Sequence, residues 1–279
     1  MLKRTLSALV LLLVGFPAVL LGGLPYFLLI GFFLAASAWE YADMFKALEL
    51  RPARPLIVGT VLAIGAVRTF HYSQFGASSI EAIYASIPIF TISILLAMAI
   101  HVIEYERGRE KSALDFAATL GGLAYLGWIG GYLIDLRALP NGGWWLMFVL
   151  PTVWMADTGA FMIGASYGKH KMTPRLSPKK SWEGFWAGAV SGILGGAFFA
   201  FVYSTWGPLS VSIWQGALFG LATGLLTPLG DLGESMLKRQ AGMKDSGNII
   251  PGHGGAFDRI DSWLWAAVLG FYFITWFVG

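Results

Sequence analysis

Charged residues gather near the C-terminal end of a sequence that otherwise contains few of them. The segment from Asp231 to Asp261 reads DLGESMLKRQAGMKDSGNIIPGHGGAFDRID. Carboxylate oxygens are the ligands that hard divalent cations such as Mg²⁺ prefer, and Lys and Arg side chains bind phosphate oxygens. We therefore expect this segment to hold a metal ion and a phosphate compound.

Three aspartates are the predicted metal ligands. Asp258 and Asp261 are three residues apart at the expected start of the last helix, so their side chains share one face, and the helix dipole favours negative charge there. Asp231 could supply a third carboxylate. Two alternatives stay open: Asp231 and Glu234 have the spacing of a helix capping box, and Asp258 and Asp261 could form an interfacial ion-pair cluster with Arg259.

A glycine-rich stretch separates these carboxylates. Its glycines let backbone N–H groups approach an anion closely, so Gly254 and Gly255 are predicted to contact the substrate. For His253 a substrate contact or proton transfer is weighed against a hydrogen-bonded structural role. The side chains predicted to bind phosphate are Lys238, Arg239 and Lys244.

A second group of candidate site residues lies upstream in the sequence. Asp157 lies within the apolar run 144–163, and a carboxylate in such a run is a functional candidate, although a hydrogen bond to Thr158 or a neighbouring helix is the alternative. The loop 164–183 is basic and turn-rich. It carries Lys179 and Lys180 just before Ser181, which is expected to cap the following helix. The loop could cover a polyphosphate or simply be a solvated topogenic loop.

The composition defines the elements that must position these residues. Of the 279 residues, 56% are hydrophobic and 13% charged, against about 25% charged in soluble proteins. Apolar runs of about 20 residues recur, and each could cross a bilayer as a helix. The fold class expected is all-α, a polytopic integral membrane protein, which excludes a soluble domain or a disordered chain. Because the sequence has no cysteine, disulfides and thiol chemistry are excluded as well.

Nine spans are predicted, with a cytoplasmic N-terminus and the C-terminus outside. The resulting inner segments contain every basic residue except Arg68 and Arg137, as the positive-inside rule requires. The first run resembles a signal peptide but is interpreted as an uncleaved helix. The division expected is a region 1–143 of about five spans and a catalytic region 144–279 of about four. The predicted spans are 5–22, 24–39, 56–70, 80–101, 113–134, 144–163, 184–203, 211–228 and 259–278.

Glycine recurs at every fourth position in two of these spans. Such faces let helix backbones approach closely, so they predict helix packing or a dimer contact, with a gap for a lipid tail as the alternative. A homodimer through a glycine-lined or aromatic helix face is a hypothesis. The glycines are Gly184, Gly188, Gly192 and Gly196 in one span and Gly216, Gly220 and Gly224 in the next.

Two other patterns are set aside. The segment from Gly164 to His170 has the wrong spacing for a phosphate-binding loop and follows a membrane helix rather than a strand. His101 and Glu104 have ligand-like spacing but end a helix in a charged loop, and no metal role is assigned to them.

The segment Ser235–Asp261 resembles the signature of the phosphatidate cytidylyltransferases. Ala256 stands where a larger apolar residue is usual. Two upstream blocks, at 157–160 and 177–184, are also similar to that family, and the resemblance is specific over roughly residues 150–265. The matching positions are Ser235, Leu237, Lys238, Arg239, Lys244, Asp245, Gly247, Ile250, Pro251, His253, Gly254, Gly255, Asp258, Arg259, Ile260 and Asp261.

The resemblance implies an enzyme that converts CTP and phosphatidate into CDP-diacylglycerol and pyrophosphate. It implies dependence on Mg²⁺, with a second cation such as K⁺ as an option, and a site on the cytoplasmic face of the cell inner membrane. The partners expected are CTP, phosphatidate and membrane lipid, with no nucleic acid. The site residues implied are catalytic Asp231, Asp258, Asp261, Lys238, Arg239 and His253, with substrate-binding Asp157, Lys179, Lys180, Ser181, Lys244, Asp245, Gly254, Gly255 and Arg259.

Two other functions stay open. A related membrane enzyme could act on another lipid, as a polyprenol kinase or an isoprenoid-lipid cytidylyltransferase. A cation-coupled transporter would use intramembrane carboxylates, but it predicts inverted repeats and interrupted helices, and the acidic residues here cluster at the cytoplasmic edge instead.

Overall fold

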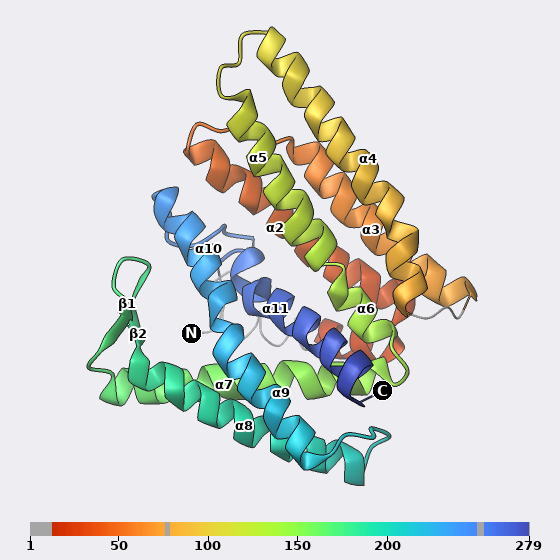
Figure 1. The fold of residues 1–279 in the computed structure, drawn as a ribbon, viewed down its shortest axis with the longest axis vertical. Coiled ribbons are helices and arrows are strands. Elements are labelled where there is room, and N and C mark those ends of the chain that lie inside the picture. Colours follow the sequence, from red (N-terminus) through yellow and green to blue (C-terminus); the bar gives the residue numbers. More distant parts are fainter. Residues whose placement is uncertain (1–12, 76–78, 250–253, 279) are drawn as a thin grey trace. The chain divides into compact units, whose positions relative to one another are not determined.

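The computed structural model describes residues 13–75, 79–249 and 254–278 (Figure 1). Helices dominate, and seven are long and apolar enough to cross a membrane, which confirms the all-α polytopic fold class. Those seven are Gly23–Ala47, Arg54–Gln74, Ile80–Glu106, Ser112–Ala138, Gly142–Tyr167, Trp182–Thr205 and Phe257–Val278.

Two of the nine predicted spans are not among these seven. The start of the first lies outside the described residues, although 13–21 are helical. The eighth corresponds to α9 (Ile213–Leu226), which has 14 residues and so is short for a bilayer of about 30 Å. Nine spans, a cytoplasmic N-terminus and an outer C-terminus therefore stay predictions.

The chain divides into two compact units. The first comprises Met1–Ala138 and Leu237–Ile260, and the second comprises Leu139–Met236 and Asp261–Gly279. The helices α10 (Pro228–Gln240) and α11 (Phe257–Phe273) each contribute residues to both. The charged C-terminal segment thus contributes residues to both units, and the predicted division into regions 1–143 and 144–279 stays a prediction.

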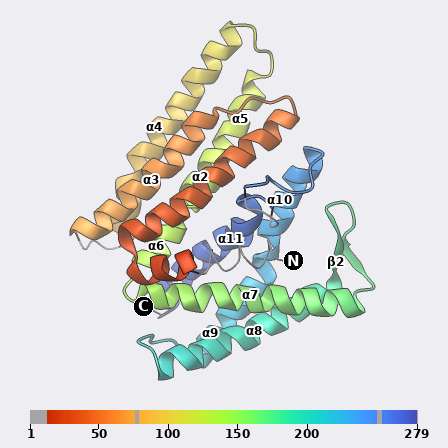
Figure 2. The same ribbon diagram turned by 180° about the vertical axis from the view of Figure 1, so that it is seen from behind.

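Four of the seven long apolar helices lie in the described part of the first unit. Helix α3 (Arg54–Phe75) packs between α2 (Gly23–Ala47) and α4 (Ser79–Glu106), as Figures 1 and 2 show from opposite sides. The fourth span consists of α5 (Ser112–Gly122), a π-helical segment at Leu123–Ile129, and α6 (Tyr132–Ala138).

The two basic residues outside the predicted cytoplasmic segments are both paired. The buried Arg68 guanidinium forms an ion pair with Asp135 and donates to Ser86 Oγ at 3.1 Å, and its Cζ lies 5.0 Å from the Trp128 ring centroid. Arg137 donates to the carbonyl oxygens of Val19 and Leu20 at 2.6 and 2.9 Å. The Asp135 carboxylate and the two carbonyl oxygens thereby gain hydrogen-bond donors that lipid could not provide.

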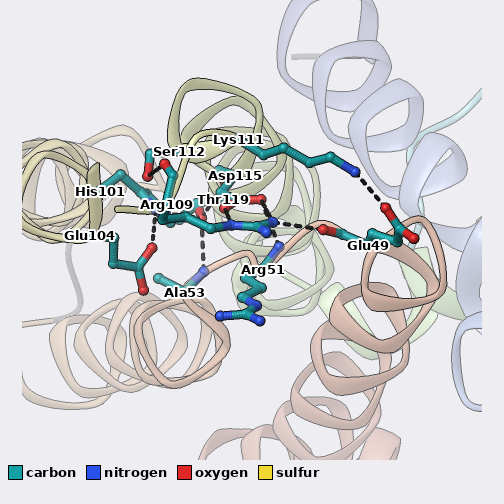
Figure 3. A network of polar contacts seen from close by, with 10 residues as sticks. All are labelled: Glu49, Arg51, Ala53, His101, Glu104, Arg109, Lys111, Ser112, Asp115 and Thr119. Carbon is teal, nitrogen blue, oxygen red and sulfur yellow. Dashed lines mark hydrogen bonds and ion pairs between the residues drawn. The ribbon is translucent and has the colours of Figure 1, made fainter. Parts of the chain in front are cut away.

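A polar network joins the connection between α2 and α3 to the connection between α4 and α5 (Figure 3). Asp115 accepts a hydrogen bond from the backbone N–H of Arg51 at 2.7 Å and pairs with Arg109 at 2.7 Å. The Lys111 ammonium bonds to the exposed Glu49 carboxyl at 2.7 Å and holds its pKa below the usual range. These contacts fix the turn after α2 against the start of α5.

His101 belongs to the same network. Its Nδ1 lies 2.8 Å from Glu104 and its Nε2 lies 2.8 Å from the Thr119 hydroxyl. With Asp115, these side chains are close enough to hold a metal ion. However, the protein already supplies hydrogen-bond partners to all three, so the arrangement is explained as a structural network.

Small residues hold the second unit together. Helix α8 (Trp182–Thr205) packs against both α9 and α7 (Gly142–Tyr167). A Cβ atom at Gly220 would collide with the carbonyl oxygen of Gly192, and one at Gly196 would collide with that of Gly216. The glycine faces therefore form a direct α8–α9 contact, as small-residue spacing predicts.

The first prediction uses two glycines with opposite surroundings. Gly220→Ala forces the α8 and α9 backbones apart, so we expect a loss of about 1–3 kcal/mol of stability. Gly59 lies in α3 with nothing within 4 Å of the Cβ position. There the same change is expected to stabilise by about 0.5–1 kcal/mol because alanine has less backbone entropy to lose. Thermal unfolding in detergent measures both variants, and equal melting temperatures would contradict the packing argument.

Candidate functional site

Three carboxylates gather in the second unit. Asp231, Glu234 and Asp261 each offer an oxygen, and these three oxygens lie within 4.8 Å of one another. Asp231 and Glu234 are three residues apart in α10 and so share a face, while Asp261 comes from α11. Such a set of hard oxygen ligands suits Mg²⁺.

A glycine permits this grouping. A Cβ atom at Gly230 would meet the backbone of Asp261 and the ring of Trp265. Gly230 therefore lets the first turn of α10 lie directly against α11, which places Asp231 beside Asp261. Any larger residue at this position would separate the two helices.

The structure argues against the capping interpretation of Asp231. Helix α10 begins at Pro228, a residue well suited to the first helical position, so Asp231 lies inside the first turn and is not the N-cap. Its carboxylate accepts a hydrogen bond from Ser235 Oγ at 3.2 Å and pairs with Lys180 Nζ at 2.8 Å.

A hairpin supplies Lys180. Strands β1 (Lys171–Thr173) and β2 (Ser177–Ser181) pair antiparallel within the predicted loop. Side chains alternate along a strand, so Lys180 turns to Asp231 while its neighbour Lys179 is exposed. At the end of β2, Ser181 Oγ accepts from the N–H of Gly184 at 3.2 Å, which confirms the predicted cap of α8.

Helix α7 brings Asp157 to the same group. The Asp157 side chain is exposed, and Lys180 and Asp231 are the charged side chains near enough to influence its carboxyl electrostatically. A Cβ atom at Gly159 would collide with Ser191 of α8, so this glycine allows α7 and α8 to pack closely just beyond Asp157. The predicted residues Asp157, Lys180, Asp231 and Asp261 thus lie together in the second unit.

Asp258 is held by a different set of groups, all within the first unit. Its Oδ1 forms an ion pair with Lys238, which is largely buried. Its Oδ2 accepts hydrogen bonds of 2.9 Å from Ser246 N and Gly255 N, and Ser246 Oγ also lies 2.9 Å from it. The partner of Asp258 is therefore Lys238, and not Arg259 as in the ion-pair alternative.

One other predicted residue, Gly254, lies beside this carboxylate, since a Cβ atom there would lie 2.8 Å from Asp258 Oδ2. Gly254 has a φ of +83°, a conformation that favours glycine, and Arg239 donates to the carbonyl of Met243 at 3.1 Å. Three predicted substrate ligands are exposed, namely Lys244, Asp245 and Arg259. His253 lies outside the described residues.

Two acidic residues of interest escaped the sequence-based prediction of site residues. Glu234 was interpreted only as part of a capping box, although its spacing from Asp231 also predicts a shared face. Glu40 of α2 is buried and accepts hydrogen bonds from Ser246 Oγ, Ala256 N and Phe257 N. The one available signal was a carboxylate at the end of an apolar run.

Comparison with known proteins identifies a family for this chain. The model of the cytidylyltransferase family matches residues 2–277. A phosphatidate cytidylyltransferase of Staphylococcus epidermidis is 32% identical over 268 residues, which cover 95% of this chain and 96% of the relative. One from Bacillus subtilis is 31% identical over 276 residues, covering 99% and 98%.

A third relative matches a shorter region more strongly. A phosphatidate cytidylyltransferase of Mycobacterium tuberculosis is 42% identical over 135 residues, which are 48% of this chain and 40% of the relative. The family match, by contrast, extends over almost the whole sequence. The chain therefore belongs to the cytidylyltransferase family and is a membrane-embedded nucleotidyltransferase.

Proposed function

We propose that this enzyme transfers CMP from CTP to phosphatidate in phospholipid biosynthesis, releasing pyrophosphate and giving CDP-diacylglycerol. The observation that carries the proposal is the grouping of Asp231, Glu234 and Asp261 with Lys180 on Asp231. The names of the full-length relatives support the substrate pair.

The proposed reaction is an in-line substitution at phosphorus. A phosphate oxygen of phosphatidate attacks the α-phosphorus of CTP, and the bond from that phosphorus to the β-phosphate oxygen breaks. Its electron pair leaves with pyrophosphate. Because both reactants are anionic, the protein must mainly position them and neutralise their charge.

The residues present fit a magnesium ion. Asp231, Glu234 and Asp261 would hold it, because their oxygens converge within 4.8 Å. When bound, Mg²⁺ would neutralise phosphate charge and polarise the reacting phosphorus–oxygen bonds. Asp258 as a further ligand and K⁺ as a second cation stay part of the proposal.

Basic side chains would bind the triphosphate and the lipid phosphate. Lys180 lies beside the carboxylate group, and Lys238 lies beside Asp258. We assign these lysines to charge neutralisation and place the site on the cytoplasmic face of the inner membrane, where CTP is available. A homodimer stays a hypothesis.

Incorporation of radiolabelled CTP by the purified protein tests the function. With phosphatidate and Mg²⁺ we expect label in the lipid phase, and none after EDTA treatment. Polyprenyl phosphates and other nucleotides serve as competing substrates in parallel reactions. Label transferred to a polyprenyl phosphate but not to phosphatidate would replace this proposal with the isoprenoid-lipid alternative.

The carboxylate group gives the second prediction. Asp231→Asn and Asp261→Asn should each lower kcat by at least about 100-fold, since each removes charge stabilisation at the reacting phosphates. Glu234→Gln is expected to act in the same direction and to raise the Mg²⁺ concentration needed for half-maximal activity. Normal turnover of folded Asp261→Asn protein would remove the metal assignment.

A matched control exists on another helix. Asp43 of α2 is partly exposed and pairs with Arg54, so Asp43→Asn removes one carboxylate charge elsewhere in the chain. It is expected to leave kcat within about twofold, because exposed ion pairs contribute only about 0–1 kcal/mol.

Lys180→Ala gives the third prediction. It should raise the KM for CTP about tenfold, equivalent to about 1.4 kcal/mol of binding, and affect kcat less than the aspartate changes do. Lys171→Ala, which removes an exposed lysine from the opposite strand, is the control. An unchanged KM in the Lys180 variant would show that this ammonium does not bind the nucleotide.

A further inference from the structure

The side chain of Glu40 is unusual for a transmembrane helix. It is 3% exposed, and burying a carboxylate is costly unless hydrogen-bond donors surround it. Among the residues that the structure describes, three groups donate hydrogen bonds to Glu40, and all come from the charged C-terminal segment, at least 206 residues along the chain. The carboxylate of α2 thus meets a segment that the sequence identifies as part of the catalytic signature.

Two of these donors are the backbone N–H groups at the start of α11. Ala256 N donates to Glu40 Oε1, and Phe257 N donates to Oε2, both at 2.9 Å. The first N–H groups of a helix lack partners within it, and a carboxylate is favoured there by the helix dipole. Glu40 therefore caps α11 from a distant helix.

Ser246 extends this contact to Asp258. Its hydroxyl lies 2.8 Å from Glu40 Oε2 and 2.9 Å from Asp258 Oδ2. The backbone N–H of Ser246 also donates to Asp258 Oδ2. One serine therefore links the buried glutamate to the aspartate that the signature predicts to be a ligand.

The segment fits closely around Glu40. A Cβ atom at Gly247 or Gly255 would collide with the Glu40 carboxylate, and one at Gly255 would also meet Ser246 Oγ. Gly255 N donates in turn to Asp258. The signature glycines are thus needed for this close approach, whether or not they also contact a substrate.

We propose that Glu40 is a positioning residue for nucleotidyl transfer, fixing the start of α11 and, through Ser246, the carboxylate of Asp258. This inference rests on the proposed function. Helix α11 carries Asp258 and Asp261 three residues apart, so a shift of its first turn moves both. Geometric errors of this kind reduce turnover more than substrate binding.

Glu40→Gln tests the role with little change in volume. Both carboxylate oxygens accept a backbone N–H, so either orientation of the amide turns its NH₂ group toward an N–H donor. We expect kcat to fall at least tenfold, KM for CTP to stay within about twofold, and the Mg²⁺ concentration for half-maximal activity to rise. Asp43→Asn, in the same helix, is the matched control and should change none of these.

A second readout does not depend on activity. Hydrogen–deuterium exchange in detergent should become faster for peptides containing Ala256 and Phe257 in Glu40→Gln, and not in Asp43→Asn. If the wild-type protein transferred no CMP, the proposed function would fail. The exchange measurement would still test whether Glu40 holds the start of α11. Exchange at these amides equal to that of wild type would overturn the positioning role.

Ser246→Ala covers the case in which Glu40→Gln does not fold. It keeps both N–H bonds of Glu40 but removes the link to Asp258, so kcat should fall with KM unchanged. If both single variants fold, the double variant should be less impaired than the product of the two effects, because both act through one chain of contacts. A Ser246→Ala or Glu40→Gln enzyme with wild-type kcat and Mg²⁺ dependence would overturn the proposal, even if its melting temperature were lower.

Discussion

A carboxylate in the interior of a membrane protein requires a positive charge or several N–H donors beside it, because neither lipid nor packed side chains can replace water. This constraint recurs throughout the structure. Asp135 meets Arg68, Asp258 meets Lys238 and two backbone N–H donors, and Glu40 meets the start of α11. Asp231, Glu234 and Asp261 also lie close to one another, and Asp231 has Lys180 and Ser235 as partners. A group of mutually repelling carboxylates is the arrangement that a divalent cation would stabilise.

Close approach of backbones makes this polar arrangement possible. In the second unit, Gly192 and Gly220 bring α8 against α9, Gly159 brings α7 against α8, and Gly230 brings α10 against α11. Each contact replaces side-chain volume by direct backbone packing. The polar residues that these helices carry, Asp157 and Asp231 among them, are consequently held at fixed positions. Rigid support of this kind suits a reaction that depends on positioning and charge neutralisation.

The sequence by itself determined the class of molecule, the helical segments and the family. Hydropathy is a local property, so apolar runs predicted the long helices. The helix ends in the structure differ from the predicted ends by several residues. Turn and cap chemistry is equally local, which is why Ser181 was identified correctly as the cap of α8. The spacing of the signature from Ser235 to Asp261 identified the family, and the glycine spacing predicted the α8–α9 contact.

Only the tertiary structure decided which carboxylates share a site. Periodicity shows that Asp231 and Glu234 lie on one face, but not that Asp261 meets them, because that contact depends on how α11 packs beside Gly230. It also decided that Lys180, and not Lys179, reaches Asp231. The role of Glu40 was least accessible of all. Its partner Ser246 is 206 residues away, and no local pattern encodes a contact that arises when distant helices bury a common polar surface.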